Sequence, residues 1–157
     1  MKAIYPGTFD PITFGHLNIL EKASRMFSEV ILAVADYTAK QNYFNLEERV
    51  RLCKECSSHL PNVQVMSFSG LVVDFAKEQE STVMIRGMRA VSDFEYELSL
   101  ALTNTKLNPG IETVFLVPSL RYMYLSSSMI RQLAELKADL TDFVPPQVAM
   151  SLKNKFH

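Results

Sequence analysis

Two short clusters, near opposite ends of the 157-residue chain, carry the groups best suited to binding phosphate. The first is Thr13-Phe14-Gly15-His16, in which a histidine follows a glycine at the start of a predicted helix. The second is Ser126-Ser127-Ser128, with Arg131 one turn into another predicted helix. Free N–H groups and the positive end of the helix dipole make a helix start attractive to anions. Taken singly each pattern is weak, since serines before a helix are usually caps.

Four further charged residues have side chains that suit the same chemistry. Lys40 lies in a polar, turn-like segment, and Arg86 and Arg89 follow a predicted strand. Glu97 falls in the first turns of a predicted helix, where an acid is also favourable for the dipole alone. We take the arginines as phosphate ligands because of their place after a strand.

Each of these assignments has a structural alternative. The two arginines could form ion pairs with Asp93, Glu95 or Glu97. Arg131 could contact a β- or γ-phosphate, or pair with Glu135 four residues later. Leu71 and Val72 could be core residues, although Gly70 before them suggests a close backbone approach.

The two cysteines, Cys53 and Cys56, form a C-x-x-C pattern, which can indicate a redox or zinc site. A redox pair needs its first thiol at a helix N-terminus, but this pair falls inside a helix opened by Asn45 and Glu48. We therefore expect two reduced thiols on a helix.

The elements that must position these groups alternate regularly. Short apolar runs predict strands at 3–5, 30–35, 63–66, 82–85 and 112–117, with Pro6-Gly7 ending the first. Helical spacing predicts helices at 16–27, 46–58, 71–77, 93–107, 127–136 and 146–155, with Ser92 able to cap the fourth. This order predicts one domain over 1–157, an α/β Rossmann-like, doubly wound sheet of five parallel strands. Helices should cover both faces, and a helical segment should follow at the C-terminus.

In such sheets a ligand lies beyond the carboxyl ends of the strands. The segments that follow the five predicted strands are 6–16, 36–40, 68–70, 86–89 and 118–128. Nearly all the candidate groups named above belong to these five segments. We therefore expect one composite cleft rather than a self-contained loop.

Composition excludes several classes of protein. Nearly half the residues are hydrophobic (48%) and 21% are charged, as in globular proteins. The net charge is −1, and no basic run exceeds two residues, so a nucleic-acid-binding stripe is not expected. We find no pattern typical of a signal peptide or a membrane span, and expect a cytoplasmic protein that binds no membrane.

Together the T-x-G-H and Ser-Ser-Ser-x-x-Arg patterns resemble those of the nucleotidyltransferase superfamily. Longer stretches resemble the bacterial phosphopantetheine adenylyltransferase family, over essentially the whole chain: residues 5–13 (YPGTFDPIT), 46–49 (LEER), 85–97 (IRGMRAVSDFEYE) and 126–128 (SSS). The resemblance implies transfer of the adenylyl group of ATP to 4′-phosphopantetheine, giving dephospho-coenzyme A and pyrophosphate, with Mg²⁺. It also implies a homohexamer of two stacked trimers.

The resemblance further implies a role for each matching residue. His16 and Lys40 would act in catalysis, and the acceptor side would be formed by Thr8, Lys40, Val72 and Arg86. ATP would contact Thr8, the backbone of Phe9, His16, Gly87, Met88, Arg89, Glu97 and the loop Tyr122, Met123, Tyr124, Leu125, Ser126, Ser127 and Ser128. Relatives often have two adjacent lysines where this chain has Lys40-Gln41. They also often have a serine at the position of Met123 and a tryptophan where this loop has tyrosine, so adenine stacking there remains open.

The reaction itself explains these residue types. A phosphate nucleophile is already ionised at neutral pH, so the site needs no general base. It needs donors and cations that bring two anions into line. His16 can donate to the phosphate under attack, and Lys40 can bridge the two reacting phosphates. With no carboxylate cluster in the sequence, Mg²⁺ is expected to enter with ATP and to be held mainly by phosphates.

Two alternatives remain open at this stage. One is a sister nucleotidyltransferase that uses CTP with a phospho-alcohol, or ATP with nicotinamide mononucleotide. The other is a non-catalytic module that binds adenine nucleotides. The Gly70-Leu71-Val72 segment and Arg86 favour a long acceptor arm ending in one phosphate, and the intact T-x-G-H favours catalysis over binding alone.

Overall fold

The computed structural model describes residues 1–38, 41–90 and 94–156. Its five strands are β1 (Lys2–Gly7), β2 (Glu29–Ala35), β3 (Val63–Phe68), β4 (Val83–Gly87) and β5 (Glu112–Leu116). They form one sheet in the order β3-β2-β1-β4-β5, and every pairing is parallel. The chain winds from β1 out to β3 and then crosses back to β4 and β5. The predicted α/β doubly wound sheet is therefore confirmed.

The helices are α1 (Phe14–Met26), α2 (Leu46–Cys56), α3 (Val72–Glu78), α4 (Phe94–Leu107), α5 (Ser127–Glu135) and α6 (Pro146–Phe156). A 3₁₀ turn, Leu120–Tyr122, was not predicted. The predicted Ser92 cap of α4 lies outside the described residues. No described helix has the length and apolar character that crossing a membrane requires.

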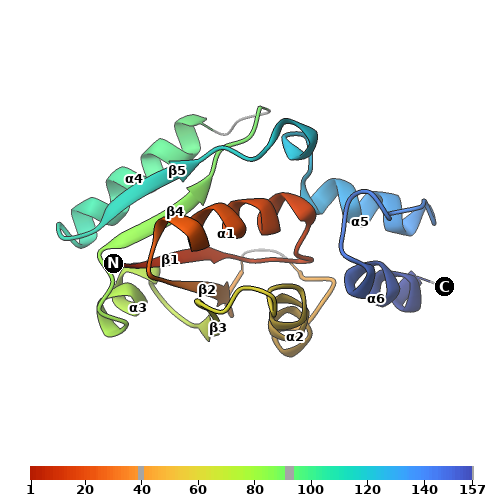
Figure 1. Cartoon of the computed structure of the whole chain (residues 1–157), viewed down its shortest axis with the longest axis horizontal. Coiled ribbons are helices and arrows are strands. Elements are labelled where there is room, and N and C mark those ends of the chain that lie inside the picture. Colours follow the sequence, from red (N-terminus) through yellow and green to blue (C-terminus); the bar gives the residue numbers. More distant parts are fainter. Residues whose placement is uncertain (39–40, 91–93, 157) are drawn as a thin grey trace.

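Two cores of unequal size cover the two faces of the sheet. The larger contains Leu32 and Ile85 of the strands together with buried residues of α1, α2, α5 and α6, such as Leu20 and Ile130. The smaller contains Ile4 and Met84 with residues of α3, and Asn104 of α4 reaches the Met84 sulfur at 3.4 Å. The helices therefore lie on both faces, as predicted. Figure 1 shows α5 and α6 at the carboxyl end of the sheet.

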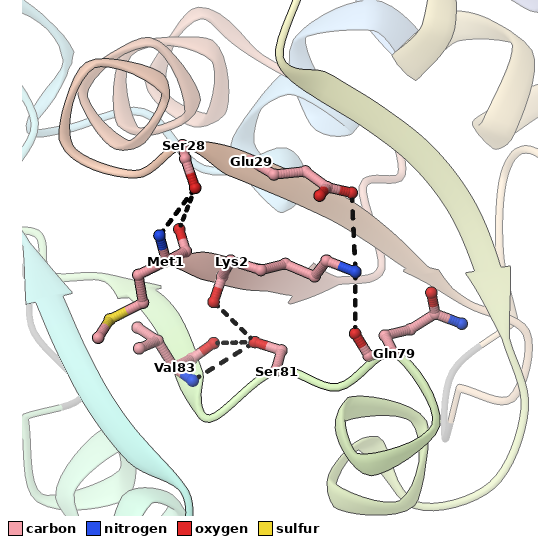
Figure 2. Close-up of polar contacts among 7 residues, drawn as sticks. All are labelled: Met1, Lys2, Ser28, Glu29, Gln79, Ser81 and Val83. Carbon is pink, nitrogen blue, oxygen red and sulfur yellow. Dashed lines mark hydrogen bonds and ion pairs between the residues drawn. The ribbon is translucent and has the colours of Figure 1, made fainter.

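The amino end of the sheet is closed by polar contacts (Figure 2). The Met1 ammonium donates to Ser28 Oγ at 2.8 Å, and Lys2 Nζ donates to the Gln79 carbonyl at 3.0 Å. Ser81 Oγ donates to the Lys2 carbonyl at 3.0 Å. These bonds join β1 to the segments that enter β2 and β4.

One predicted boundary is wrong in an informative way. Pro6-Gly7 does not end the first strand, because β1 stays paired with β2 up to Gly7. Proline is tolerated in this central strand because the ladder between β1 and β4 covers only Ala3 and Ile4 with Val83 and Met84. The missing N–H of Pro6 therefore costs no ladder bond there. Beyond Ile4 the two strands no longer pair, and this is where the winding of the sheet reverses.

The two cysteines lie on α2 as expected. Asn45 and Glu48 form the capping box that opens this helix, with both reciprocal bonds at 2.9 Å. Both thiols are free and buried. Burial raises the pKa of Cys56 to about 11 and that of Cys53 further, so both stay protonated and unreactive.

Candidate functional site

His16 is held in one tautomer by the cap of α1. Thr13 Oγ1 accepts the His16 N–H, and the Thr13 N–H donates to His16 Nδ1 at 3.1 Å. Because Nδ1 accepts this bond, the neutral ring carries its proton on Nε2. Burial, Arg89 and Arg86 lower the pKa of His16 to about 4. The side chain is therefore a neutral N–H donor at pH 7.

The turn before α1 adopts a backbone conformation that is unusual for its residues. Phe9 has a φ of 51°, in the left-handed region that most side chains avoid. Its ring is buried edge-on between Tyr5 and His16, with centroid distances of 5.3 and 5.1 Å. The same ring lies over Gly7, where a Cβ would come within 2.9 Å of it. Gly7 is thus required for the packing that fixes this turn.

Asp10 and Arg49 join this turn to the segment that follows β2. Asp10 is 4% exposed, and its two carboxylate oxygens accept the N–H groups of Tyr43 and Phe44, each at 2.9 Å. Arg49, 1% exposed, donates to the carbonyls of Thr8, Ala35 and Phe44 at 2.8–3.1 Å. The sequence analysis missed both residues as site residues. Both fall inside stretches that carry the family resemblance, 5–13 and 46–49, but neither was given a role there.

Arg86 bridges the point where β1 and β4 separate. Its Nη1 donates to the Pro6 carbonyl at 3.1 Å, and Nε and Nη2 donate to both oxygens of Glu97 at 2.8 and 2.7 Å. Arg86 therefore forms the ion pair that was its structural alternative, with Glu97 of α4 as the partner. Nη1 and Nη2 each keep a second N–H, so Arg86 retains donors for a ligand. The expected contact of Glu97 with the nucleotide stays a prediction.

Arg89, together with Gly87 and Met88, continues the chain from β4 toward the C-terminal loop. Arg89 Nη1 donates to the Leu125 carbonyl at 2.8 Å, and the Met88 N–H donates to the Leu116 carbonyl at 2.9 Å. These bonds bring the predicted nucleotide residues after β4 against those of the loop before α5.

The serine cluster lies against the first turn, as the composite site requires. Ser126 Oγ caps α5 by accepting the Met129 N–H at 3.2 Å, and Ser127 Oγ donates to the Pro11 carbonyl at 2.8 Å. Arg131 donates to the Asp10 carbonyl at 2.7 Å and lies over the Tyr43 ring, 5.5 Å from its centroid. The Glu135 carboxylate instead accepts the Tyr43 hydroxyl. Residues more than 110 positions apart thus share one region, which we call the phosphate end.

Tyr122 and Tyr124 of the same loop make aromatic contacts within the chain. The Tyr122 ring lies 5.9 Å from Phe14, and Tyr124 meets Phe143 edge-on at 6.3 Å. A Cβ on Gly15 would lie 3.7 Å from the Tyr122 carbonyl and from Leu125 Cβ. The start of α1 and this loop are therefore closely packed, while adenine stacking on either tyrosine stays a prediction.

Two further residues of the predicted site are Lys40 and Val72. Lys40 lies outside the described residues. Val72 packs against the smaller core with Met66 and Phe68, which is the alternative that the sequence analysis gave to a binding role. The close backbone approach predicted at Gly70 concerns the acceptor arm and stays a prediction; within the described chain, a Cβ there would meet nothing within 4 Å. The φ of 78° at Gly70, in the turn before α3, is a separate reason for glycine.

The donors of the phosphate end suit anions better than metals. Among the described residues, no three histidine, cysteine or acidic side chains gather to hold a metal ion. The groups that converge here are arginines, hydroxyls and the Nε2–H of His16. They fit a nucleotide phosphate chain, whose own oxygens are the ligands that Mg²⁺ prefers.

The chain is similar to known proteins in sequence and in fold. The family model described as "Cytidylyltransferase-like" matches residues 4–133, which include strands β2 to β5, most of β1 and most of the phosphate end. A solved structure from Vibrio parahaemolyticus, provisionally described as a nicotinate-nucleotide adenylyltransferase, shares the fold with a TM-score of 0.74. The match covers 98% of this chain and 91% of that one, at 19% sequence identity.

Proposed function

The chain belongs to the cytidylyltransferase-like family, within the nucleotidyltransferase superfamily, and we propose that it transfers the adenylyl group of ATP to 4′-phosphopantetheine. The products would be dephospho-coenzyme A and pyrophosphate. The proposal rests on the sequence resemblance for the acceptor and on the geometry of the phosphate end for the chemistry.

The observation that carries the chemistry is the state of His16. Its imidazole is neutral, its proton is on Nε2, and two arginines lie close enough to depress its pKa. Such a group is a poor base and a good donor. Adenylyl transfer to a phosphate requires no base, because the nucleophile is already an anion. It requires a donor to the α-phosphate, on which negative charge builds as the attacking oxygen arrives.

The remaining residues divide between the two substrates in this proposal. Thr8, Lys40, Val72 and Arg86 bind the acceptor. Gly87, Met88, Arg89, Glu97 and the loop from Tyr122 to Ser128 bind ATP. Lys40 bridges the two reacting phosphates, and Mg²⁺, carried by ATP, screens the triphosphate and the leaving pyrophosphate.

A coupled pyrophosphate assay tests this proposal. The purified protein is incubated with Mg²⁺ and each of four pairs: ATP with phosphopantetheine, ATP with nicotinate mononucleotide, ATP with nicotinamide mononucleotide, and CTP with phosphocholine. We expect release only from the first pair, with dephospho-coenzyme A identified by mass. Release from another pair alone would replace the acceptor while keeping the reaction class. Release from none, with ATP bound, would favour a non-catalytic nucleotide-binding module.

We also propose a cytoplasmic homohexamer of two stacked trimers, from the same resemblance. The support on the molecule is α4, which leaves Phe94, Tyr96, Leu98, Leu102 and Leu107 between 41% and 64% exposed. A helix with this much exposed apolar surface is typical of one that packs against a second copy.

A further inference from the structure

Tyr5 lies in the floor of the phosphate end, and its hydroxyl makes no hydrogen bond within the part of the chain that the structure describes. The side chain is only 5% exposed, but its hydroxyl oxygen is not among the fully buried atoms without a partner, so this oxygen keeps contact with solvent. A tyrosine with a buried ring and an open hydroxyl can bond to water or to a ligand that displaces the water. The hydroxyl is therefore a donor open to whatever the phosphate end binds.

The position of Tyr5 places this hydroxyl where β1 and β4 separate. Tyr5 is the first residue of β1 beyond its ladder with β4, which ends at Ile4 and Met84. A Cβ built on Gly87 would lie 3.9 Å from the Tyr5 hydroxyl oxygen. The hydroxyl thus lies between the two strands, beside Arg86 and Gly87, at the turning point of the sheet where ligands bind in doubly wound folds.

The groups around Tyr5 select the kind of atom that can satisfy it. Arg86 and Arg89 are donors only, so neither can accept its proton. The Glu97 carboxylate can accept, but its hydrogen bonds in the described structure go to Arg86 and not to Tyr5. Burial raises the pKa of Tyr5 well above its usual value, so the hydroxyl stays a donor at every physiological pH. What is missing is an acceptor, and the two guanidinium groups favour one that is negatively charged.

We propose that the Tyr5 hydroxyl binds the phosphate acceptor, donating to an oxygen of its terminal phosphate beside Arg86. This inference deepens the proposed function and rests on it for the placement of the acceptor next to Arg86. Tyr5 acts here as a binding residue and takes no proton in the reaction. Its ring, held edge-on by Phe9, fixes the direction of the hydroxyl.

Tyr5→Phe tests the inference, because it removes one oxygen and keeps the ring. A hydrogen bond to a charged group contributes about 1.5–3 kcal/mol, so KM for the acceptor should rise roughly 10- to 100-fold. KM for ATP should change less than about two-fold. Since no partner within the chain is lost, the melting temperature should stay the same. This combination separates a ligand contact from a structural role, in which stability would fall.

The control is Ser58→Ala, which removes an exposed hydroxyl that donates to the Glu55 carbonyl just after α2. It should leave both KM values within about two-fold and should not raise the melting temperature. Should Tyr5→Phe fail to fold, ¹³C-tyrosine labelling of the wild type replaces it. One Cζ resonance should shift on titration with phosphopantetheine. ATP alone should leave that resonance in place.

The assay of the four substrate pairs is run first, so that failure of the proposed reaction can be distinguished from failure of the proposed role of Tyr5. If the wild type uses a different acceptor, the proposed substrate is wrong, and the Tyr5→Phe comparison is made with the acceptor it does use. If it uses none, calorimetric titration with phosphopantetheine replaces KM. Three results would overturn the assignment of Tyr5. They are an unchanged KM or binding constant for the acceptor, a rise in KM for ATP alone, and a loss of stability with both KM values intact.

Discussion

His16 shows how one hydrogen bond decides what a side chain can do. Because the Thr13 N–H occupies Nδ1, only Nε2 can face a ligand, and it does so as a donor. Removing one preorganised donor typically costs about 2.7–4 kcal/mol of transition-state stabilisation. His16→Ala should therefore lower kcat roughly 10²- to 10³-fold while changing ATP affinity only slightly, as measured by steady-state kinetics and calorimetry.

The control for His16→Ala is His59→Ala, on the exposed side chain that contacts Glu21. It should keep kcat within about two-fold. A folded His16→Ala protein with unchanged turnover would contradict the role of His16. A large loss of ATP affinity with kcat intact would reduce it to a ground-state contact.

The depressed pKa of His16 also predicts a pH dependence of stability. Between about pH 4 and the usual histidine pKa near 6.5, the unfolded chain binds a proton at this position that the folded chain does not. The free energy of unfolding should therefore fall as pH drops through this window. His16→Gln, whose amide oxygen can still accept the Thr13 N–H, should lack this component.

Urea unfolding at several pH values measures both proteins. Asp10, whose pKa is raised by burial, titrates in both and cancels in the difference. The stability difference should grow in favour of the wild type from pH 4 to 6.5 and stay level above it. Parallel curves would show that His16 keeps an ordinary pKa.

At the scale of elements, the chain joins separate loops through buried charged groups. Asp10 accepts two N–H groups from the segment before α2, and Arg49 donates to three carbonyls from three segments. In Asp10→Asn, one of the two amides would face an NH₂ group instead of an oxygen. A buried donor left without an acceptor costs about 1–3 kcal/mol, and we expect a loss of stability in that range.

Denaturant unfolding checks this loss, with Asp142→Asn on an exposed side chain as the control, expected within about 0.5 kcal/mol. Because Lys40 belongs to the segment that Asp10 joins to the first turn, KM for the acceptor should rise as well. An Asp10→Asn protein as stable as the wild type would mean that the two amide bonds contribute little.

The sequence predicted the elements better than their connections. Apolar runs and caps located all five strands and six helices, because burial and capping are local signals. The extension of β1 through Pro6-Gly7 was missed, since it depends on β4 no longer pairing there. The φ of 78° at Gly70 was not foreseen, because sequence alone does not separate a glycine needed for its φ from one needed for space.

In the candidate site too, local patterns were predicted and long-range contacts were not. The T-x-G-H and serine patterns were recognisable because each is contiguous. Asp10 and Arg49 escaped notice because each bonds to a group more than 30 residues away, and Tyr5 because the arginine beside it lies on another strand. Bonds over such distances follow from the winding of the sheet and from packing, which no local pattern encodes.

At the scale of the whole molecule, the two ends of the sheet have different roles. The amino end is closed by bonds among Met1, Lys2, Ser28 and Ser81 (Figure 2). The carboxyl end gathers donors from both ends of the chain, and α5 and α6 extend it (Figure 1). Because the winding reverses between β1 and β4, the residues after these two strands meet there. The fold therefore concentrates the candidate phosphate donors at one end and leaves the other for stability.

The whole molecule also has an outer surface that a monomer leaves exposed. Figure 1 shows α4 beside β5 at the edge of the molecule, and Asn104 is the one buried residue of this helix. Leu102, 64% exposed, lies near its middle. If α4 contacts a second copy, Leu102→Glu should place an unpaired charge in an apolar interface and release monomers or smaller assemblies.

Sedimentation velocity measures this change, with Thr103→Glu as the control because it adds the same charge at the neighbouring exposed position. The control should keep the wild-type assembly, and both variants should have monomer stabilities within about 0.5 kcal/mol of each other, since surface substitutions cost little. Arg86 pairs with Glu97 on the same helix, so loss of the assembly should also raise KM for the acceptor. A wild-type assembly that survives Leu102→Glu unchanged would mean that α4 is not the contact between copies.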